Sequence, residues 1–364
     1  MNTSRLVEKF FRYVSCDSES GNEREFCELI EAELKALGLT VSRQEVGAQC
    51  NSNGWNVHAF LEGEGEPILF SAHMDTVPPG NGIVPVLDGG VIRSKGDTIL
   101  GADDKGGIAP IMEALEMIKE QNLAHRPVEV LFSICEELGL LGAKYADYSQ
   151  VKSKEAVVLD NGPMGEMINR SPAKATIHVK ITGKSAHAAA APDKGINAIK
   201  AAAAAIDKIP CGFVDECSVM NVANFLAPGK SNIVAEKASF DIDLRSFEAD
   251  RLQAHLDAIE AAVKSGCDTL GASYEIFVDR QIVAPLFVPS DSALVRRLLQ
   301  VSADLGIVCE FGRTFGASDA AWLFQNGIDV INVGTGMTDV HSTDEHISVA
   351  DLEKTTGLVF GMMQ

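Results

Sequence analysis

The segment Pro67-Ile68-Leu69-Phe70-Ser71-Ala72-His73-Met74-Asp75 carries the pattern that indicates the architecture of this 364-residue chain. A short, continuously apolar run is typical of a strand that is buried on both faces. Two further runs have the same form, because Val128–Glu137 ends in two glutamates and Ala156–Asp160 ends in an aspartate. Sites in open α/β sheets form beyond the carboxyl ends of the strands. We therefore expect these polar side chains to gather at one edge of a sheet.

Strand patterns alternate with helical patterns around these runs, which predicts an α/β fold with a mostly parallel sheet and helices on both faces. The clearest helix is predicted over Lys105–Glu120, where apolar residues recur every three or four positions. Residues 5–37 predict two helices separated by a polar loop, in which Ser20 and Asn22 are candidate caps of the second helix.

The pattern changes after about Ser171. Ala175–Ile181 and Ala238–Arg245 alternate in the manner of half-exposed antiparallel strands, and helical stretches separate the strands of this block. We therefore expect an inserted α+β domain over residues 172–284. Residues 1–171 and 285–364 would then form one discontinuous larger domain.

The composition excludes several classes of partner. A formal net charge of −20 argues against nucleic acid and against an anionic membrane surface as partners.

The eight cysteines show no paired C-x-x-C spacing, so they indicate a reducing compartment rather than a disulfide framework. The sequence shows no signal-peptide pattern and no apolar stretch of the roughly 20 residues that a membrane span needs. The predicted location is cytoplasmic.

Each polar strand end has an ordinary explanation when it is taken alone. His73 and Asp75 suit a surface turn before two prolines, and Glu136 with Glu137 suits a solvated loop. The pair Asp103-Asp104 suits the start of a helix, where acidic groups are favoured. Several such endings at one sheet edge are harder to explain in this way. Because carboxylate and imidazole groups are ligands for divalent metals, a metal site is the leading hypothesis.

Five motifs in order along the chain resemble the M20 family of dinuclear zinc peptidases, and among them the peptidase T-like tripeptide aminopeptidases. The motifs are Ser71–Val77, Gly101–Gly107, Glu136–Gly139, Asp160 and His341–Glu345. The resemblance covers essentially the whole chain, including the inserted domain, which would serve as a lid or a dimerisation domain.

This resemblance implies two metal ions per chain, most simply Zn²⁺, with Mn²⁺ or Co²⁺ as alternatives. Asp103 would bridge both ions, and Asp75 would orient His73. Glu136 would be the general base, and the peptide bond after Asp103 is often cis in this family. The remaining implied ligands are His73 and Asp160 for one ion and Glu137 and His341 for the other.

The resemblance also implies roles in the inserted domain. His187 would donate a hydrogen bond to the reacting oxygen, in its own subunit or in the partner subunit of a homodimer. Asn232 and Arg245 would contact the substrate, since a guanidinium fits a peptide carboxylate. The ordinary alternatives are a structural loop histidine at position 187 and a surface salt bridge at Arg245.

The expected activity is release of the N-terminal residue from short peptides, and the resemblance implies tripeptides as substrates. Removal of acyl groups from amino acids and cleavage of C-terminal residues are alternatives within the same family. A non-catalytic metal-binding or peptide-binding protein is the alternative from another class. Such a protein would be expected to lack a ligand or the general base, and both are present here.

Overall fold

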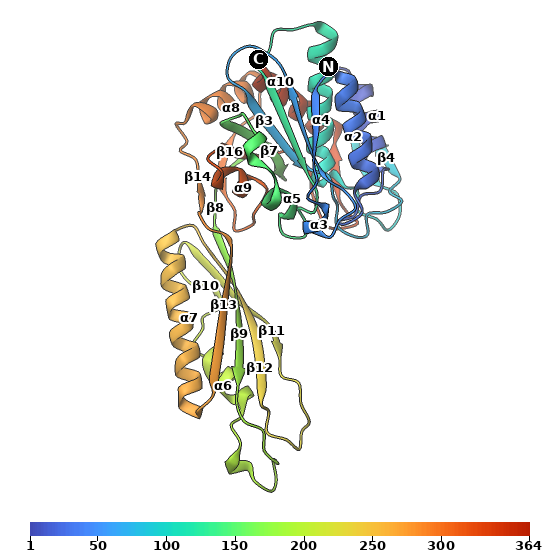
Figure 1. Cartoon of the computed structure of the whole chain (residues 1–364). Helices are drawn as coiled ribbons and strands as arrows, with labels where there is room; N and C mark the ends of the chain where they lie inside the picture. The colour runs from blue at the N-terminus through green and yellow to red at the C-terminus, as the bar shows by residue number, and fades with distance from the viewer. The chain divides into compact units, whose positions relative to one another are not determined.

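The chain, described over residues 1–364 by a computed structural model, separates into two units (Figure 1). The larger unit contains Met1–Asn169, Phe287–Arg313 and Ala317–Gln364. The smaller unit contains Arg170–Leu286 together with the short segment Thr314–Gly316, which the sequence analysis did not assign to it. No helix combines the length and the apolar character that crossing a membrane requires.

A nine-stranded sheet forms the larger unit, in the order β1-β2-β6-β3-β7-β16-β8-β14, with β15 paired to β8. The neighbours β6-β3-β7-β16 at its centre run parallel, and antiparallel pairs flank them on both sides. The predicted α/β class is therefore confirmed. The strands are β1 Thr40–Gln44, β2 Asn56–Leu61, β3 Ile68–His73, β6 Val128–Ser133, β7 Glu155–Asn161, β8 Glu166–Ser171, β14 Leu286–Phe287, β15 Glu310–Arg313 and β16 Asp329–Gly334. A separate three-stranded sheet consists of β4 Pro85–Asp88, β5 Val91–Ser94 and β17 His346–Ser348.

The helices of the larger unit pack on this sheet and on one another. Helix α4 packs on β3 and β7 and is buried along most of its length. This burial explains why the helix predicted there contains so many apolar residues. The chain leaves α2 through Gly38, whose φ of 94° is a left-handed conformation that glycine adopts without strain. The helices are α1 Thr3–Val14, α2 Arg24–Leu37, α3 Gly47–Cys50, α4 Ala102–Gln121, α5 Leu141–Tyr145, α8 Ala293–Asp304, α9 Ala320–Gln325 and α10 Val349–Met363, with a 3₁₀ turn at Tyr148–Gln150.

The expected capping of the second helix by Ser20 or Asn22 is wrong. Helix α2 begins after Glu23, and no side chain caps it. The hydroxyl of Ser20 instead donates to Asp75 Oδ2 at 2.7 Å. The polar loop therefore supports the segment after β3 rather than the start of α2.

The smaller unit is a five-stranded antiparallel sheet, in the order β10-β11-β12-β9-β13, with one face packed against two helices. Along β9 the buried and exposed residues alternate, as the sequence predicted for a half-exposed strand. Asn197 caps α6 by accepting from the amides of Ile199 and Lys200. The elements are β9 Ala173–Thr182, a 3₁₀ turn at Pro192–Lys194, α6 Ala198–Ile206, β10 Gly212–Phe213, β11 Ser218–Leu226, β12 Lys237–Ser246, α7 Ala249–Leu270 and β13 Ser273–Ile282.

Candidate metal centre

The four central parallel strands end at the same edge of the large sheet, and each delivers polar side chains there. His73 is the last residue of β3, and Asp160 lies near the end of β7. Glu136 and Glu137 follow β6, and His341 lies in the loop after β16. The neighbouring order β6-β3-β7-β16 explains how residues far apart in sequence meet.

Asp103 lies between two imidazoles. Its Oδ1 is 2.8 Å from His73 Nε2, and its Oδ2 is 3.1 Å from His341 Nε2. The same nitrogen of His341 is 2.7 Å from Glu137 Oε1. One carboxylate that offers a separate oxygen to each of two histidines has the geometry of a bridging ligand. The peptide bond from Asp103 to Asp104 is cis, as the resemblance implies.

Two overlapping groups of side chains have metal-ligand spacing, and both include His73. The potential ligand atoms of His73, Asp103 and Glu137 lie within 4.8 Å of one another, and so do those of His73, Asp104 and Asp160. Asp104 is fully buried, its Oδ2 accepts from the His73 amide at 3.2 Å, and its Oδ1 has no hydrogen-bond partner. Asp104 is thus a further acid of the centre, beside the Asp103 that the resemblance selects.

Burial and mutual repulsion make the charged form unfavourable for several acids of this centre. Burial, with repulsion from Asp160, raises the pKa of Glu136 well above its usual range. Burial and the charge of Asp103 do the same to the pKa of Asp160, and burial raises the pKa of Glu137. Imidazole nitrogens and carboxylate oxygens in this number suit two divalent ions of the zinc, manganese or cobalt type. The residues therefore fit the metal group that the resemblance implies.

Asp75 contacts more of the centre than His73 alone. His73 Nδ1 lies 2.9 Å from the backbone carbonyl of Asp75 and 3.5 Å from its Oδ1, so Asp75 contacts this ring on its Nδ1 side. Its carboxylate also accepts the backbone amides of Glu136 at 2.9 Å and Glu137 at 3.2 Å. Asp75 thereby links the histidine on β3 to the two glutamates after β6.

Glu345 anchors the segment that carries Asp103. Its side chain is 1% exposed, and it accepts the amides of Leu100 at 2.7 Å, Gly101 at 2.8 Å and Asp103 at 3.0 Å. Glu345 ends the motif His341–Glu345, and no role was expected for it. His346 begins β17, and its Nδ1 lies 2.9 Å from the carbonyl of Asp344.

Two more residues of the centre were missed. Asp319, at the start of α9, is 3% exposed and accepts from the hydroxyl of Ser133, and burial raises its pKa to about 6. Asn332 on β16 fixes the backbone of Asp160, because its side chain accepts the Asp160 amide at 3.0 Å and donates to the Asp160 carbonyl at 2.6 Å. Neither lies at the end of an apolar run, which was the signal used.

The three remaining predicted residues lie in the smaller unit, whereas the candidate metal ligands all lie in the larger one. His187 is exposed, and its Nδ1 accepts the amides of Ala189 at 3.2 Å and Ala190 at 3.1 Å. A neutral His187 therefore carries its proton on Nε2, which is left to donate. Asn232 lies beside it, because its carbonyl accepts the Ala188 amide at 3.0 Å.

Arg245 is already engaged within the smaller unit. Its Nε and Nη2 donate to the two carboxylate oxygens of Asp243 at 2.8 and 3.2 Å, and its Nη1 donates to the Phe315 carbonyl at 2.7 Å. A guanidinium has five N–H donors, so two stay available after these bonds. The ring of Phe315 packs on Phe213 and Phe247, with centroids 5.5 and 4.5 Å apart.

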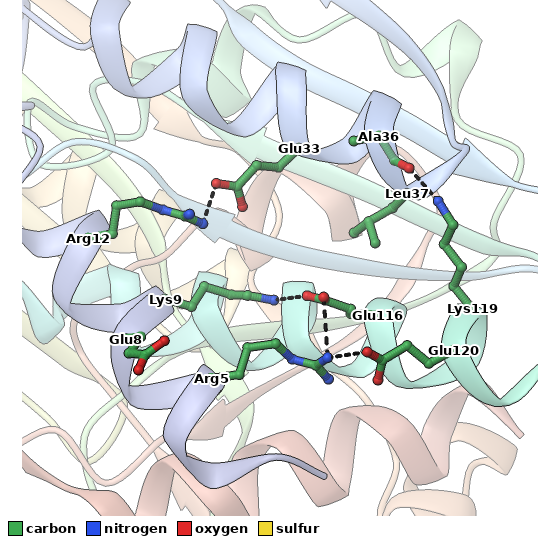
Figure 2. Close-up of a pocket in the computed structure, with 10 residues that line it drawn as sticks. All are labelled: Arg5, Glu8, Lys9, Arg12, Glu33, Ala36, Leu37, Glu116, Lys119 and Glu120. Carbon is green, nitrogen blue, oxygen red and sulfur yellow. Dashed lines mark hydrogen bonds and ion pairs between the residues drawn. The ribbon is translucent and has the colours of Figure 1, made fainter.

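A cavity of about 670 Å³ lies elsewhere in the larger unit, between α1, α2 and α4 (Figure 2). Figure 2 shows that the cations lining it are already paired: Arg12 with Glu33, Lys9 with Glu116, and Arg5 with Glu116 and Glu120. The fourth cation, Lys119, donates to the carbonyl of Ala36. Because its cations already have partners within the protein, we do not consider this cavity a candidate reaction site.

Comparison with known proteins supports one family. A sequence model described as Peptidase family M20/M25/M40 matches residues 69–364. The protein named Uncharacterized protein YqjE of Bacillus subtilis (strain 168) is 32% identical over 368 residues, covering 100% of this chain and 99% of that protein. The structure of aminopeptidase PepT from Bacillus cereus ATCC 10987 has a TM-score of 0.93 and 32% identity, covering 100% of this chain and 98% of that one. A tripeptidase from Staphylococcus aureus subsp. aureus Mu50 has a TM-score of 0.94 and 29% identity, with the same coverage.

Proposed function

Because this chain belongs to peptidase family M20/M25/M40 and is a peptide hydrolase of the peptidase T-like branch, we propose that it releases the N-terminal residue of short peptides, with tripeptides as the preferred length. The resemblance expected from the motifs is confirmed by the family match. The observation that best supports the proposal is the position of Asp103 between His73 and His341, with Glu136 and Glu137 on the adjoining strand end.

In the proposed reaction, His73, Asp103, Asp160, Glu137 and His341 hold two divalent ions. These ions, when bound, polarise the scissile carbonyl and make a water acidic enough to lose a proton near neutral pH. Zn²⁺ is the preferred identity, and the ligand set also accepts Mn²⁺ or Co²⁺.

Glu136 is the proposed general base. Its side chain is 8% exposed, and burial holds its pKa well above the usual range. A carboxylate of raised basicity is suited to take a proton from the attacking water and to return it to the leaving amine. Its neighbour Glu137 faces His341. In this proposal Glu136 transfers the proton and Glu137 binds metal.

In the smaller unit, His187 is the proposed donor to the oxygen that gains charge during attack. Its Nε2–H is left for this role because Nδ1 is occupied by two backbone amides. Asn232 and Arg245 are the proposed substrate contacts, with the two remaining N–H groups of Arg245 directed at a peptide carboxylate. A homodimer through this unit remains a prediction of the sequence analysis.

The test is a comparison of substrates. Trialanine, dialanine, N-acetyl-trialanine, trialanine amide and N-acetyl-alanine are incubated with the protein loaded with zinc, manganese or cobalt, and the products are separated by mass. We expect cleavage of free trialanine, release of alanine and dialanine amide from trialanine amide, and no cleavage of the N-acetylated peptide. Cleavage of N-acetyl-alanine would favour a deacylase, and release of the last residue from N-acetyl-trialanine would favour a carboxypeptidase. Glu136→Gln is the control for contaminating peptidases.

A further inference from the structure

Four consecutive backbone amides at the end of β6 are bound by side chains rather than by a neighbouring strand. The Ile134 amide donates to Asn56 Oδ1 at 3.1 Å, and the Cys135 amide donates to Glu23 Oε1 at 3.2 Å. The next two amides, of Glu136 and Glu137, donate to Asp75. The direction in which both glutamates leave the sheet is therefore set by a small number of buried polar side chains.

Glu23 is an unusual member of this set, since it belongs to neither the candidate ligands nor the segment around β3. Its side chain is completely buried. Its partners are neutral donors, namely the amides of Gly21 and Cys135, the hydroxyl of Ser52 and the thiol of Cys135. Burying a carboxylate among neutral groups is unfavourable unless its oxygens are hydrogen-bonded, so the contacts that Glu23 makes are part of what holds this region together.

The residue that Glu23 holds has a strained backbone. Cys135 has a φ of 50°, in the left-handed region that non-glycine residues occupy only at a cost. Such a conformation persists when its surroundings over-determine it, and these positions cluster at functional sites. Here Glu23 Oε1 receives both the amide and the thiol of Cys135, at 3.2 and 3.1 Å. Cys135 directly precedes Glu136, so its backbone angles aim the glutamate.

We propose that Glu23 is a positioning residue for Glu136: its buried carboxylate holds Cys135 in the left-handed conformation that directs the Glu136 side chain into the metal centre. This role rests on the proposed function for its effect on catalysis, but the ordering of residues 134–137 does not depend on it. Glu23 itself touches no reacting group.

The test compares Glu23→Ala with Glu23→Gln. Glutamine keeps an oxygen for the Cys135 amide and turns its NH₂ toward the Ser52 hydroxyl, which can accept, so it should rescue the structure. Glu33→Ala is the matched control, because Glu33 lies on α2 and binds Arg12 and Tyr13 away from the sheet edge. Cys135→Ala removes the thiol donor while keeping the amide. Two readouts are needed: hydrogen exchange of the peptide that covers residues 134–137, and kcat and KM for trialanine at full metal occupancy.

We expect Glu23→Ala to speed exchange in residues 134–137 by about tenfold or more, with β3 unchanged. Its kcat should fall by about 10- to 100-fold with KM within about twofold, since small misplacements of a catalytic group have effects of this size. Glu23→Gln, Cys135→Ala and Glu33→Ala should stay within about threefold of the unaltered protein in both readouts.

Unchanged exchange in Glu23→Ala overturns the proposal, and so does faster exchange with an unchanged kcat. A glutamine variant as impaired as the alanine variant also overturns it, as does a loss that appears only in KM or in metal content. If the unaltered protein cleaves no peptide, the proposed function fails. The exchange result then decides alone whether Glu23 orders the segment that carries Glu136.

Discussion

Removing the carboxylate of Glu345 should destabilise the larger unit by an amount that the structure allows us to work out. In Glu345→Ala, the amides of Leu100, Gly101 and Asp103 lose their common acceptor in a fully buried place. A buried donor left without a partner costs about 1–3 kcal/mol. Allowing for water that enters the space left behind, we expect a loss of about 3–5 kcal/mol in the free energy of unfolding.

Glu345→Gln should be much milder. Its single carbonyl oxygen can replace Oε2, which accepts from Leu100 and Gly101, while its NH₂ meets the Asp103 amide as donor against donor. One unsatisfied amide corresponds to about 1–2 kcal/mol. Glu345→Ala should therefore be clearly less stable than Glu345→Gln.

Urea unfolding of the metal-free protein, followed by tryptophan fluorescence, measures both effects. The two tryptophans, Trp55 and Trp322, lie in the larger unit, so the signal reports on the unit that contains Glu345. Asp344→Ala is the control, because this neighbouring acid is exposed and should change stability by less than about 0.5 kcal/mol. A cost below about 1 kcal/mol for the alanine variant, or equal costs for alanine and glutamine, would refute the argument.

Three further predictions concern the centre and the sheet. Glu136→Gln should keep its metal but lower kcat by about 100- to 10,000-fold, the usual contribution of a general base; full hydrolysis by this variant in the peptide assay would contradict its role. Reconstituted protein should bind close to two divalent ions per chain by elemental analysis and His341→Ala close to one, so equal metal content in both would argue against a ligand at 341. Hydrogen bonds from His58 and Ser153 outweigh the effect of burial and lower the pKa of Glu129, so its folded pKa lies below its unfolded value of about 4.3. The stability that ionised Glu129 contributes is therefore present above about pH 4.3 and is lost as the pH falls through the folded pKa. In Glu129→Gln, the free energy of unfolding in urea should depend less on pH in that acid range. An unchanged pH dependence would show that these hydrogen bonds do not stabilise the charged form.

The strand ends of the centre could be predicted from sequence because the signal there is strong and local. The apolar runs become β3, β6 and β7, which end within about two residues of the predicted ends, and each delivers the expected polar group to one edge. His341 lies in the loop after β16 rather than directly at the strand end, and its role entered through the resemblance of a complete motif.

The supports of the centre could not be predicted, because their partners are distant backbone amides. Glu23 binds the Cys135 amide across 112 positions, and Glu345 binds the Asp103 amide across 242. A single acid in a polar loop has the same local sequence whether it faces water or such an amide. For the same reason Ser20 was assigned to a helix cap, whereas its hydroxyl lies against Asp75.

No strand was predicted over Ser218–Leu226, the observed β11, and the cause is different. Only its first three residues show the expected alternation of burial, and the rest of Ser218–Leu226 is exposed or half-buried. A strand without a buried face along most of its length leaves no period of two for sequence analysis to detect. Its pairing with β12 holds it in the sheet instead.

The short segment Thr314–Gly316 has a consequence for how this protein can be recombined with its relatives. Phe315 fills the space between Phe213 and Phe247, and its carbonyl binds Arg245. A chimaera that exchanged only residues 170–286 would therefore receive a unit whose aromatic cluster is completed by the recipient's own residue 315. A chimaera designed to transfer substrate preference would therefore also need the segment around residue 315 exchanged, downstream of the main graft. The smaller unit is therefore built from two separate pieces of sequence, and a graft has to carry both.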